Sequence, residues 1–364
     1  MEAFVRSHIR EMSAYEPVLP FEVRARQLGI SPEHMLKLDA NENPYGPLPE
    51  VLGALSRLPY VHIYPDPESG FLREALAEYT GVPAEHLMVG AGADELIDLI
   101  ARLFLEPGDA VLTCPPTFGM YAFVAHLSAA RVIPISRRQD FSLQVEEIEA
   151  TVERERPKVL FLASPNNPDG GLISSATLER LLKLPVVVVL DEAYIEFAPP
   201  SSSHITETLR WENLIVLRTF SKWAGLAGLR VGYGAFPKRL MKYLWKIKQP
   251  YNVSVAAQEA ARIALEHRDE LQRRRDRIVA AREAFYRELR AIPYLEPYPS
   301  QANFILCRVV RGSAATLHHT LMARGVLVRY FNSPGLQDFI RISIGRPEEM
   351  EKLLNTLRQL PFPP

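Results

Sequence analysis

Short runs of apolar and β-branched residues alternate with amphipathic stretches along most of the chain. Between residues 94 and 104, for example, leucine, isoleucine and phenylalanine recur on one broad helical face. Continuous apolar strands separated by helices are typical of a parallel or mostly parallel sheet that is covered on both faces. The pattern predicts strands at 87–89, 110–113, 131–135, 159–163, 186–190, 214–217 and 229–233, with helices at 94–104, 120–128, 145–155 and 237–247.

The pattern changes after residue 250. One long helix is predicted over 255–289 and is suited to join two domains, and strands at 303–309, 325–331 and 339–344 then alternate with helices at 314–323 and 347–360. A chain of 364 residues also exceeds what one hydrophobic core usually serves. We therefore predict an N-terminal arm over 1–35 that packs with the small domain, a large domain over 36–250 and a small α+β domain over 251–364.

Composition and charge exclude several classes of protein. The chain is 47% hydrophobic and 23% charged, unlike disordered, collagen-like or coiled-coil sequences. The 42 Lys and Arg residues nearly balance the 43 Asp and Glu residues, which predicts no nucleic-acid or membrane partner. No apolar stretch approaches the roughly 20 residues of a membrane span, the N-terminus lacks a secretory pattern, and two cysteines form no disulfide framework or metal motif. A soluble, cytoplasmic, metal-independent protein is expected.

The chemistry of the sequence lies where the predicted strands end, because ligands of open α/β sheets bind beyond the carboxyl ends of the strands. The strand at 87–89 is followed by GAGAD at 90–94, which opens a helix. Helix N-termini offer free N–H groups and a positive dipole end to a phosphate. Alone, this turn fits a capped strand-to-helix connection equally well, and it lacks the third glycine of a dinucleotide-binding motif.

Three more strand ends carry polar residues: SPNNPDGG follows 159–163, Asp191 follows 186–190, and RTFSK, which ends in Lys222, follows 214–217. Each has an ordinary alternative as a loop, an N-cap or a solvated lysine. Together the four strand ends supply an anion site, an amide, a carboxylate and an amine. Pyridoxal phosphate requires these groups: an amine for its aldehyde, an anion for its ring nitrogen, a donor for its ring oxygen, and a phosphate site.

A set of motifs occurs in a consistent order along nearly the whole chain. They are LDANENPYGP at 38–47, YPDP at 64–67, GADE at 92–95, CPPTFGMY at 114–121, SPNNP at 164–168, DEAYIEF at 191–197, SK at 221–222, GLR at 228–230 and IRISIG at 340–345. In these motifs the chain resembles the fold-type-I, pyridoxal-phosphate-dependent aminotransferases, and among them the histidinol-phosphate aminotransferases. The resemblance implies an α/β fold: a large domain with a mostly parallel seven-stranded sheet between helices, and a smaller α+β domain. It also implies a homodimer with shared active sites.

The resemblance assigns roles to the residues at the strand ends. Lys222 would hold the cofactor and shuttle the substrate proton, Asp191 would pair with the ring nitrogen, and Phe118 would stack on the ring. Asn166 and Tyr194 would donate to the ring oxygen. The phosphate would contact the N–H groups of Ala93 and Asp94, the side chains of Thr219, Ser221 and Arg230, and Tyr64 of the neighbouring subunit.

Four further residues match substrate-binding positions of the family. Arg341 would clamp the substrate α-carboxylate, since a planar guanidinium suits a bidentate anion. Arg329 and Tyr15 match positions that meet the substrate phosphate, and Asn43 is also assigned to the substrate. Two departures affect the local contacts: Asp-Gly-Gly follows Asn167-Pro168 where Thr-Gly is common, and Phe118 stands where many relatives have tyrosine.

The activity implied is transfer of an amino group between glutamate or 2-oxoglutarate and imidazole-acetol phosphate or histidinol phosphate, in histidine biosynthesis. An aromatic-amino-acid transaminase and an enzyme resembling threonine-phosphate decarboxylase remain alternatives on the same cofactor. A nucleotide- or cofactor-binding regulatory module without turnover is a third reading. It is disfavoured because both Lys222 and Asp191 are present and no basic segment precedes the domain.

Overall fold

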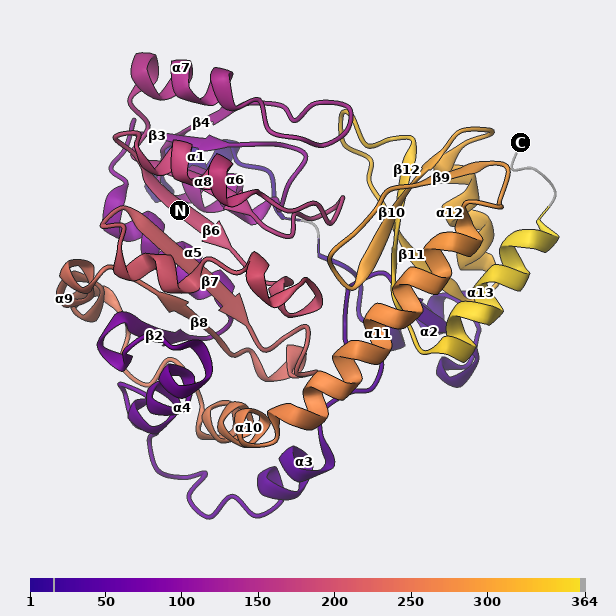
Figure 1. The fold of residues 1–364 in the computed structure, drawn as a ribbon, viewed down its shortest axis with the longest axis horizontal. Coiled ribbons are helices and arrows are strands. Elements are labelled where there is room, and N and C mark those ends of the chain that lie inside the picture. Colours follow the sequence, from indigo (N-terminus) through magenta and orange to yellow (C-terminus); the bar gives the residue numbers. More distant parts are fainter. Residues whose placement is uncertain (16, 361–364) are drawn as a thin grey trace.

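The computed structural model describes residues 1–15 and 17–360, which form two sheets with helices around them. Figure 1 shows the two sheets side by side, with the long helix α11 (Arg268–Leu289) running from the larger layer toward the smaller one. No helix of the described part is long and apolar enough to cross a membrane. Within the same residues, no cluster of three or more His, Cys, Asp or Glu side chains could hold a metal ion.

The larger sheet has seven strands in the order β2-β8-β7-β6-β5-β3-β4, and only β8 runs antiparallel to its neighbours. The mostly parallel seven-stranded sheet is thus confirmed. Its strands are β2 (Leu87–Gly90), β3 (Ala110–Thr113), β4 (Arg131–Pro134), β5 (Val159–Ala163), β6 (Val187–Asp191), β7 (Leu214–Thr219) and β8 (Gly232–Ala235).

The central strands are apolar throughout because helices cover both faces of the sheet. Phe161, Val189 and Ile215 lie in one core, whereas Leu160, Val188 and their neighbours lie in the other. The first core includes residues of α5 (Ala93–Phe104), α6 (Met120–Leu127) and α9 (Lys238–Ile247). The second includes residues of α3 (Pro49–Leu55), α4 (Gly70–Thr80), α7 (Val145–Glu155), α8 (Ser175–Leu182) and α10 (Val255–Glu266).

The smaller sheet is mixed and has five strands in the order β1-β11-β12-β10-β9. Its elements are β1 (Leu36–Leu38), β9 (Leu295–Pro297), β10 (Phe304–Val309), β11 (Val326–Tyr330), β12 (Phe339–Ser343), α12 (Ala314–Ala323) and α13 (Pro347–Gln359). β1 pairs in parallel with β11, so a short segment near the N-terminus completes a sheet made otherwise from the last third of the chain.

The predicted division at residues 35 and 250 remains a prediction, and several segments lie across it. β1 belongs to the smaller sheet, whereas α10 packs against α3 and α4 beside the larger one. The arm itself divides between the two layers. α1 (Ser7–Glu11) contacts α6, while α2 (Phe21–Leu28) packs near Leu327 of β11.

Two predicted elements differ from the structure. The helix expected over 255–289 is two helices, which meet at His267 with φ −104° and ψ 29°. The alanine face of α10 packs on α3 and α4, and Figure 1 shows α11 leaving in another direction. The strand expected at 229–233 begins only at Gly232, because Arg230 adopts a left-handed conformation with φ 53° that aims its side chain at Asp94.

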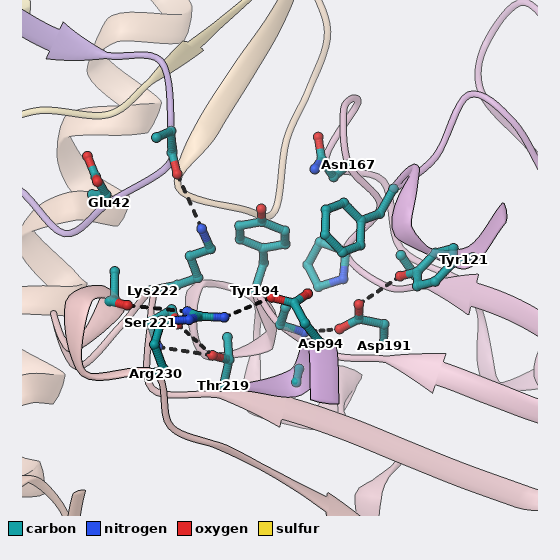
Figure 2. A pocket seen from close by; sticks show the side chains of 17 residues that line it. Glu42, Asp94, Tyr121, Asn167, Asp191, Tyr194, Thr219, Ser221, Lys222 and Arg230 are labelled. Carbon is teal, nitrogen blue, oxygen red and sulfur yellow. Dashed lines mark hydrogen bonds and ion pairs between the residues drawn. The ribbon is translucent and has the colours of Figure 1, made fainter. Parts of the chain in front are cut away.

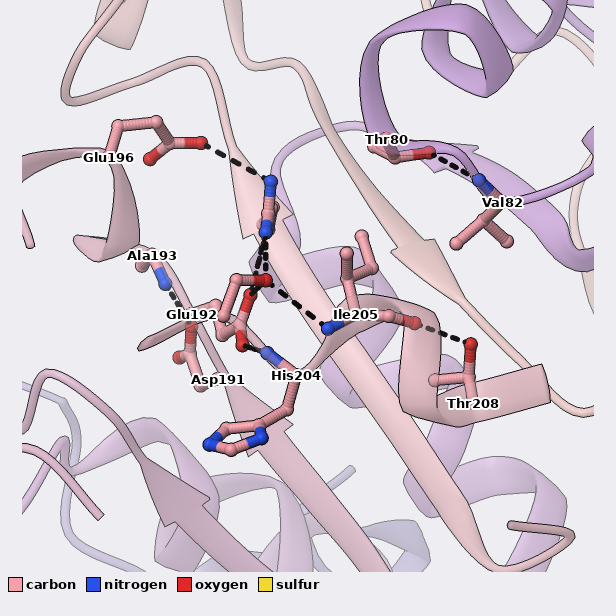
Figure 3. Close-up of polar contacts among 11 residues, drawn as sticks. Thr80, Val82, Asp191, Glu192, Ala193, Glu196, His204, Ile205 and Thr208 are labelled. Carbon is pink, nitrogen blue, oxygen red and sulfur yellow. Dashed lines mark hydrogen bonds and ion pairs between the residues drawn. The ribbon is translucent and has the colours of Figure 1, made fainter. Parts of the chain in front are cut away.

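At the end of β6, consecutive carboxylates serve different purposes, since successive side chains of a strand point to opposite faces. Asp191 lines a cavity, while Glu192 is fully buried in an ion pair of 2.9 Å with Arg218 of β7. Glu192 also accepts hydrogen bonds from the Ser203 hydroxyl and the His204 backbone (Figure 3). Arg218 therefore neutralises a carboxylate that would otherwise be buried with its charge unpaired.

Removing this cation should destabilise the fold. Arg218→Met leaves Glu192 buried without its charge partner, and we expect the free energy of unfolding to fall by about 3 kcal/mol or more in urea titrations. Arg239→Met is the matched control, because the Arg239 side chain is 85% exposed and should change stability by less than about 0.5 kcal/mol. Equal stability of the two variants would contradict the assignment.

Candidate active site

A cavity of about 200 Å³ lies at the carboxyl ends of the central strands (Figure 2). Nine of the residues predicted from the sequence to hold a ligand line it: Ala93, Asp94, Phe118, Asp191, Tyr194, Thr219, Ser221, Lys222 and Arg230. Tyr121, Asn167 and Glu42 also line it and were not assigned from the sequence. The strand ends thus meet in one cavity, as their positions along the sheet require.

One end of the cavity is suited to an anion. The first turn of α5 presents backbone N–H groups that have no partner within the helix. Arg230 reaches this turn, donating to Asp94 Oδ2 at 2.8 Å and to Ser221 Oγ at 3.4 Å. A Cβ atom on Gly232 would lie 2.6 Å from the backbone nitrogen of Ala93, so only glycine permits this close approach.

Lys222 lines the wall of the cavity. Its Nζ donates to the Ala40 carbonyl oxygen at 3.2 Å and lies 5.7 Å from the centre of the Tyr194 ring. Figure 2 shows the lysine pointing toward the segment that follows β1. The lysine therefore contacts both the larger sheet, which carries it, and a segment that is continuous with the smaller sheet.

Asp191 is buried opposite the anion end. Its Oδ2 accepts from the Tyr121 hydroxyl at 2.7 Å, and its Oδ1 accepts from the Ala193 backbone at 3.0 Å. Burial raises the pKa of the Asp191 carboxyl to about 6, while the bond from Tyr121 opposes that rise. No cationic side chain hydrogen-bonds to this carboxylate among the described residues, so a cationic ligand atom would complete its contacts.

Tyr121 was missed from the sequence although it ends one of the quoted motifs. It lies three residues after Phe118 at the start of α6, and its ring stacks on Phe161 with centroids 5.0 Å apart. The Phe118 ring meets it edge-on at 5.6 Å. Phe118 precedes α6, so no helical spacing links the two residues in the sequence, and only the fold brings the Tyr121 hydroxyl to Asp191.

The structure places Asn167, and not the predicted Asn166, on the wall of the cavity. The Asn166 side chain is buried and occupied: its Nδ2 donates to Asp169 and to the Pro116 carbonyl, and its Oδ1 accepts from Thr117. Asn167 lines the cavity instead. Asp169 closes the loop by accepting from the Gly171 backbone. This buried carboxylate holds Asn166 away from the cavity.

A second cavity of about 390 Å³ adjoins the first, and Lys222, Tyr194 and Asn167 line both. Tyr15, Arg329 and Arg341 lie in this second cavity, as their predicted substrate roles require. The Arg341 guanidinium donates to Asn167 Oδ1 at 2.6 Å and to the Asp39 carbonyl at 2.8 Å. Burial lowers the pKa of Arg341 to about 10, so the group is still cationic at neutral pH.

Besides Asn166, two predicted residues lie outside both cavities. Asn43 is buried behind Lys222, where its Nδ2 donates to the Trp223 carbonyl at 2.7 Å and its Oδ1 accepts from Tyr45. It fixes the backbone beside the lysine and has no free amide for a substrate. Tyr64 is 77% exposed and stacks on Tyr251 with ring centroids 4.6 Å apart, away from the cavity of its own chain.

Comparison with known proteins identifies the family. The model for "Aminotransferase class I and II" matches residues 33–357. The chain belongs to this family. It is 52% identical to the chloroplastic histidinol-phosphate aminotransferase of Nicotiana tabacum, across 98% of this chain and 86% of that protein. The corresponding enzyme of Roseiflexus castenholzii is 50% identical, with 98% of each chain covered.

A solved structure of the family is also similar. The crystal structure of histidinol-phosphate aminotransferase from Sinorhizobium meliloti in complex with pyridoxal-5'-phosphate superposes with a TM-score of 0.89. The two sequences are 29% identical, and the match covers 98% of this chain and 96% of the other. The predicted fold-type-I architecture is therefore confirmed for this chain.

The burial of Asp191 has a consequence for stability that can be measured. Since its pKa is raised in the folded state from 3.8 to about 6, the folded protein holds the proton more tightly than the unfolded chain does. Stability therefore falls as the pH rises between these values, by about 3 kcal/mol in total. Asp191→Asn should unfold, without added ligand, at higher urea than the unchanged protein at pH 7.5.

This advantage of Asp191→Asn should disappear as the pH approaches 4, where the unchanged carboxyl is protonated. Asp140→Asn is the control, because Asp140 is exposed and hydrogen bonds from Ser142 lower the pKa of its carboxyl. A pH-independent difference between Asp191→Asn and the unchanged protein would contradict the assignment.

Proposed function

We propose that the protein is a pyridoxal-phosphate-dependent histidinol-phosphate aminotransferase. It transfers an amino group between glutamate or 2-oxoglutarate and imidazole-acetol phosphate or histidinol phosphate, in histidine biosynthesis. One observation carries the proposal: in a chain of the aminotransferase family, Lys222, the buried Asp191 and the Ser221 and Arg230 end of the site all line one cavity. Relatives of that name that are 50% and 52% identical over 98% of the chain support the choice within the family.

The chemistry of the residues present fits pyridoxal phosphate. The first turn of α5, Ser221 and Arg230 suit the phosphate, and Asp191 suits a protonated ring nitrogen. Phe118 and Ala193 line the cavity with apolar surface for the ring. Tyr194 and Asn167 provide a hydroxyl and an amide for the ring oxygen. When bound, this cofactor supplies an electron-withdrawing ring that stabilises negative charge developing at the substrate Cα.

Groups of the protein itself supply the other functions of the site. Lys222 is the only lysine on the cavity wall among the described residues, so it is the group that attaches the cofactor and moves the proton at the substrate Cα. Asp191, held by Tyr121 and Ala193, keeps its charge directed at the ring nitrogen. The Ala40 carbonyl gives the lysine amine a defined position in the absence of substrate.

The substrate side of the cavity supports a phosphorylated substrate. Arg329 and Arg341 are register partners on the antiparallel strands β11 and β12, and both line the second cavity. Two adjacent guanidinium groups match the double negative charge of a phosphate, while a carboxylate needs only one. Tyr15 adds a hydroxyl on the same wall. The aromatic transaminase alternative does not explain why a second arginine lines this cavity.

A half-reaction assay tests this function. Holoprotein mixed with histidinol phosphate should convert its bound cofactor to the amine form, followed by absorbance, and the apparent rate constant should exceed that with phenylalanine. Lys222→Ala is the blank. A clear preference for phenylalanine would indicate the aromatic transaminase. Release of carbon dioxide from phosphothreonine would indicate the decarboxylase.

We further propose that the active unit is a homodimer in which Tyr64 completes the partner's phosphate site. The support is an apolar groove on the surface of the described chain. It is lined by Leu58, Tyr60, Ile63, Tyr64, Phe71 and Val255, and Phe71 is 79% exposed. A continuous exposed apolar surface of this kind is typical of an interface. A cytoplasmic location, expected from the sequence, remains a prediction.

The dimer makes a prediction of its own. Phe71→Asp places a charge in the apolar groove and should give a monomer in sedimentation velocity, with pyridoxal phosphate bound at least tenfold more weakly (~1.4 kcal/mol). Leu209→Asp is the control, because Leu209 is 45% exposed but does not line the groove. A Phe71→Asp protein that remains dimeric would exclude this surface as the interface.

A further inference from the structure

Asn41 connects the two sheets, and the proposed function gives this residue no role. It is 1% exposed and has a left-handed backbone with φ 55°. Its backbone nitrogen donates to Ser343 Oγ at 2.8 Å, and its carbonyl accepts from Asn303. Its side chain contacts Ser343 Oγ at 2.8 Å and Tyr194 Oη at 3.1 Å. The residue therefore links the smaller sheet to the hydroxyl that faces the cavity.

The hydrogen bonds in this group have a consistent direction. Ser343 Oγ accepts from the Asn41 backbone N–H and donates its own hydrogen to Asn41 Oδ1. This orients the amide with its oxygen toward Ser343 and its NH₂ group toward Tyr194. The Asn41 amide must then donate to Tyr194 Oη, because an NH₂ group accepts no hydrogen bond.

Tyr194 consequently keeps its own hydroxyl hydrogen free for the cavity that it lines. We propose that Asn41 is a positioning residue that forces the Tyr194 hydroxyl to act as a donor toward the ring oxygen of the cofactor. The identity of that acceptor rests on the proposed function. Without Asn41 as a donor, the hydroxyl could turn its hydrogen toward a protein acceptor and present only a lone pair to the ligand.

The same contacts tie this donor to the substrate side of the site. Ser343 and Arg341 are two residues apart on β12, so their side chains lie on the same face of the strand. Asn41 is likewise two residues from Asp39, whose carbonyl accepts from Arg341. The orientation of the Tyr194 hydroxyl and the position of the Arg341 guanidinium therefore depend on one short buried segment.

Asn41→Asp is the sharpest test because it reverses one hydrogen bond with little change in shape. Aspartate tolerates the left-handed conformation. Its two oxygens can accept from Ser343 and from the Tyr194 hydroxyl, which would remove the donor from the cavity. Tyr194→Phe removes the same donor directly. A donor to the ring oxygen favours its charged form, so its loss should raise the pH at which the bound cofactor's absorption changes by about one to two units.

The measurement is an absorbance titration of each holoprotein, together with the dissociation constant of pyridoxal phosphate from the apoprotein. We expect similar upward shifts for Asn41→Asp and Tyr194→Phe. The titratable groups around Tyr194 are Lys222, Asp191, Arg341, Tyr15 and Tyr121, and all are kept in both variants. A difference between the two variants therefore reflects the changed residue alone.

The double variant separates hydrogen-bond direction from added charge. If Asn41→Asp acts through the Tyr194 hydrogen, it should add no further shift to Tyr194→Phe, whereas a purely electrostatic effect should add its full shift. Additive shifts, or no shift from Asn41→Asp beside a clear one from Tyr194→Phe, would overturn the role of Asn41. No shift from Tyr194→Phe would overturn that role together with the donor role of Tyr194 in the proposed function.

Ser343→Ala provides the test if Asn41→Asp lacks the circular dichroism of the unchanged protein. This variant removes only the hydroxyl that fixes the amide orientation, so the Asn41 side chain can rotate and accept from Tyr194. We expect a smaller upward shift than for Tyr194→Phe, and an unchanged midpoint would overturn the proposal.

Discussion

The site depends on the Asp191 carboxylate, which is buried without a cationic side chain hydrogen-bonded to it among the described residues. Asp191 lies at the end of an apolar strand, where desolvation opposes ionisation and only a phenol and a backbone amide donate to it. The neighbouring Glu192 is the contrasting case, since a guanidinium and two further donors satisfy it on the opposite face. Strand alternation thus gives one acid a structural partner and reserves the other for a cationic ligand atom.

The second constraint is the segment that follows β1, because it fixes the two sheets relative to each other at the cavity. Ala40 receives the Lys222 amine, Asn41 holds Tyr194 and Ser343, and Asn43 holds the backbone of Trp223. These contacts come from successive residues of one short stretch, so a shift of the smaller sheet would move all of them. The Arg341 guanidinium, which donates to the Asp39 carbonyl of the same stretch, is thereby placed at a defined position relative to the amine.

The general architecture and the chemistry at the strand ends could be predicted from the sequence, since both follow from apolar strands that end in polar residues. Asp191 was found because a charge directly after a buried strand is unusual, Lys222 because it lies in the loop after another strand, and Arg230 from the family resemblance. Details set by tertiary contacts could not be found. Whether Asn166 or Asn167 faces the cavity depends on Asp169, which captures the first amide from within the loop.

Other errors have the same origin. In the sequence Tyr121 cannot be distinguished from an ordinary core residue. Its role is visible only in the fold, where its hydroxyl donates to Asp191. The Asn43 amide is of a type that could bind a substrate, yet in the fold it donates to the backbone carbonyl of Trp223, which is distant in sequence. The apolar pattern of 255–289 continues through His267 without a glycine or proline, so nothing local marks the change of direction that packing imposes. A residue's side chain shows what it can do, while its neighbours in the fold decide whether it is available.

The arrangement of charges also explains how one cavity can prefer a phosphorylated substrate without a closely fitting shape. Arg329 and Arg341 lie opposite each other on paired strands, and burial, with a smaller contribution from the charge of Arg329, lowers the pKa of Arg341. At neutral pH Arg341 is still cationic, because its pKa is lowered only to about 10. A single carboxylate relieves part of this repulsion, whereas a phosphate dianion can neutralise both groups. In the proposed function, a phosphorylated substrate would therefore meet two cations on paired strands, and a cationic ring atom would meet the buried Asp191 carboxylate.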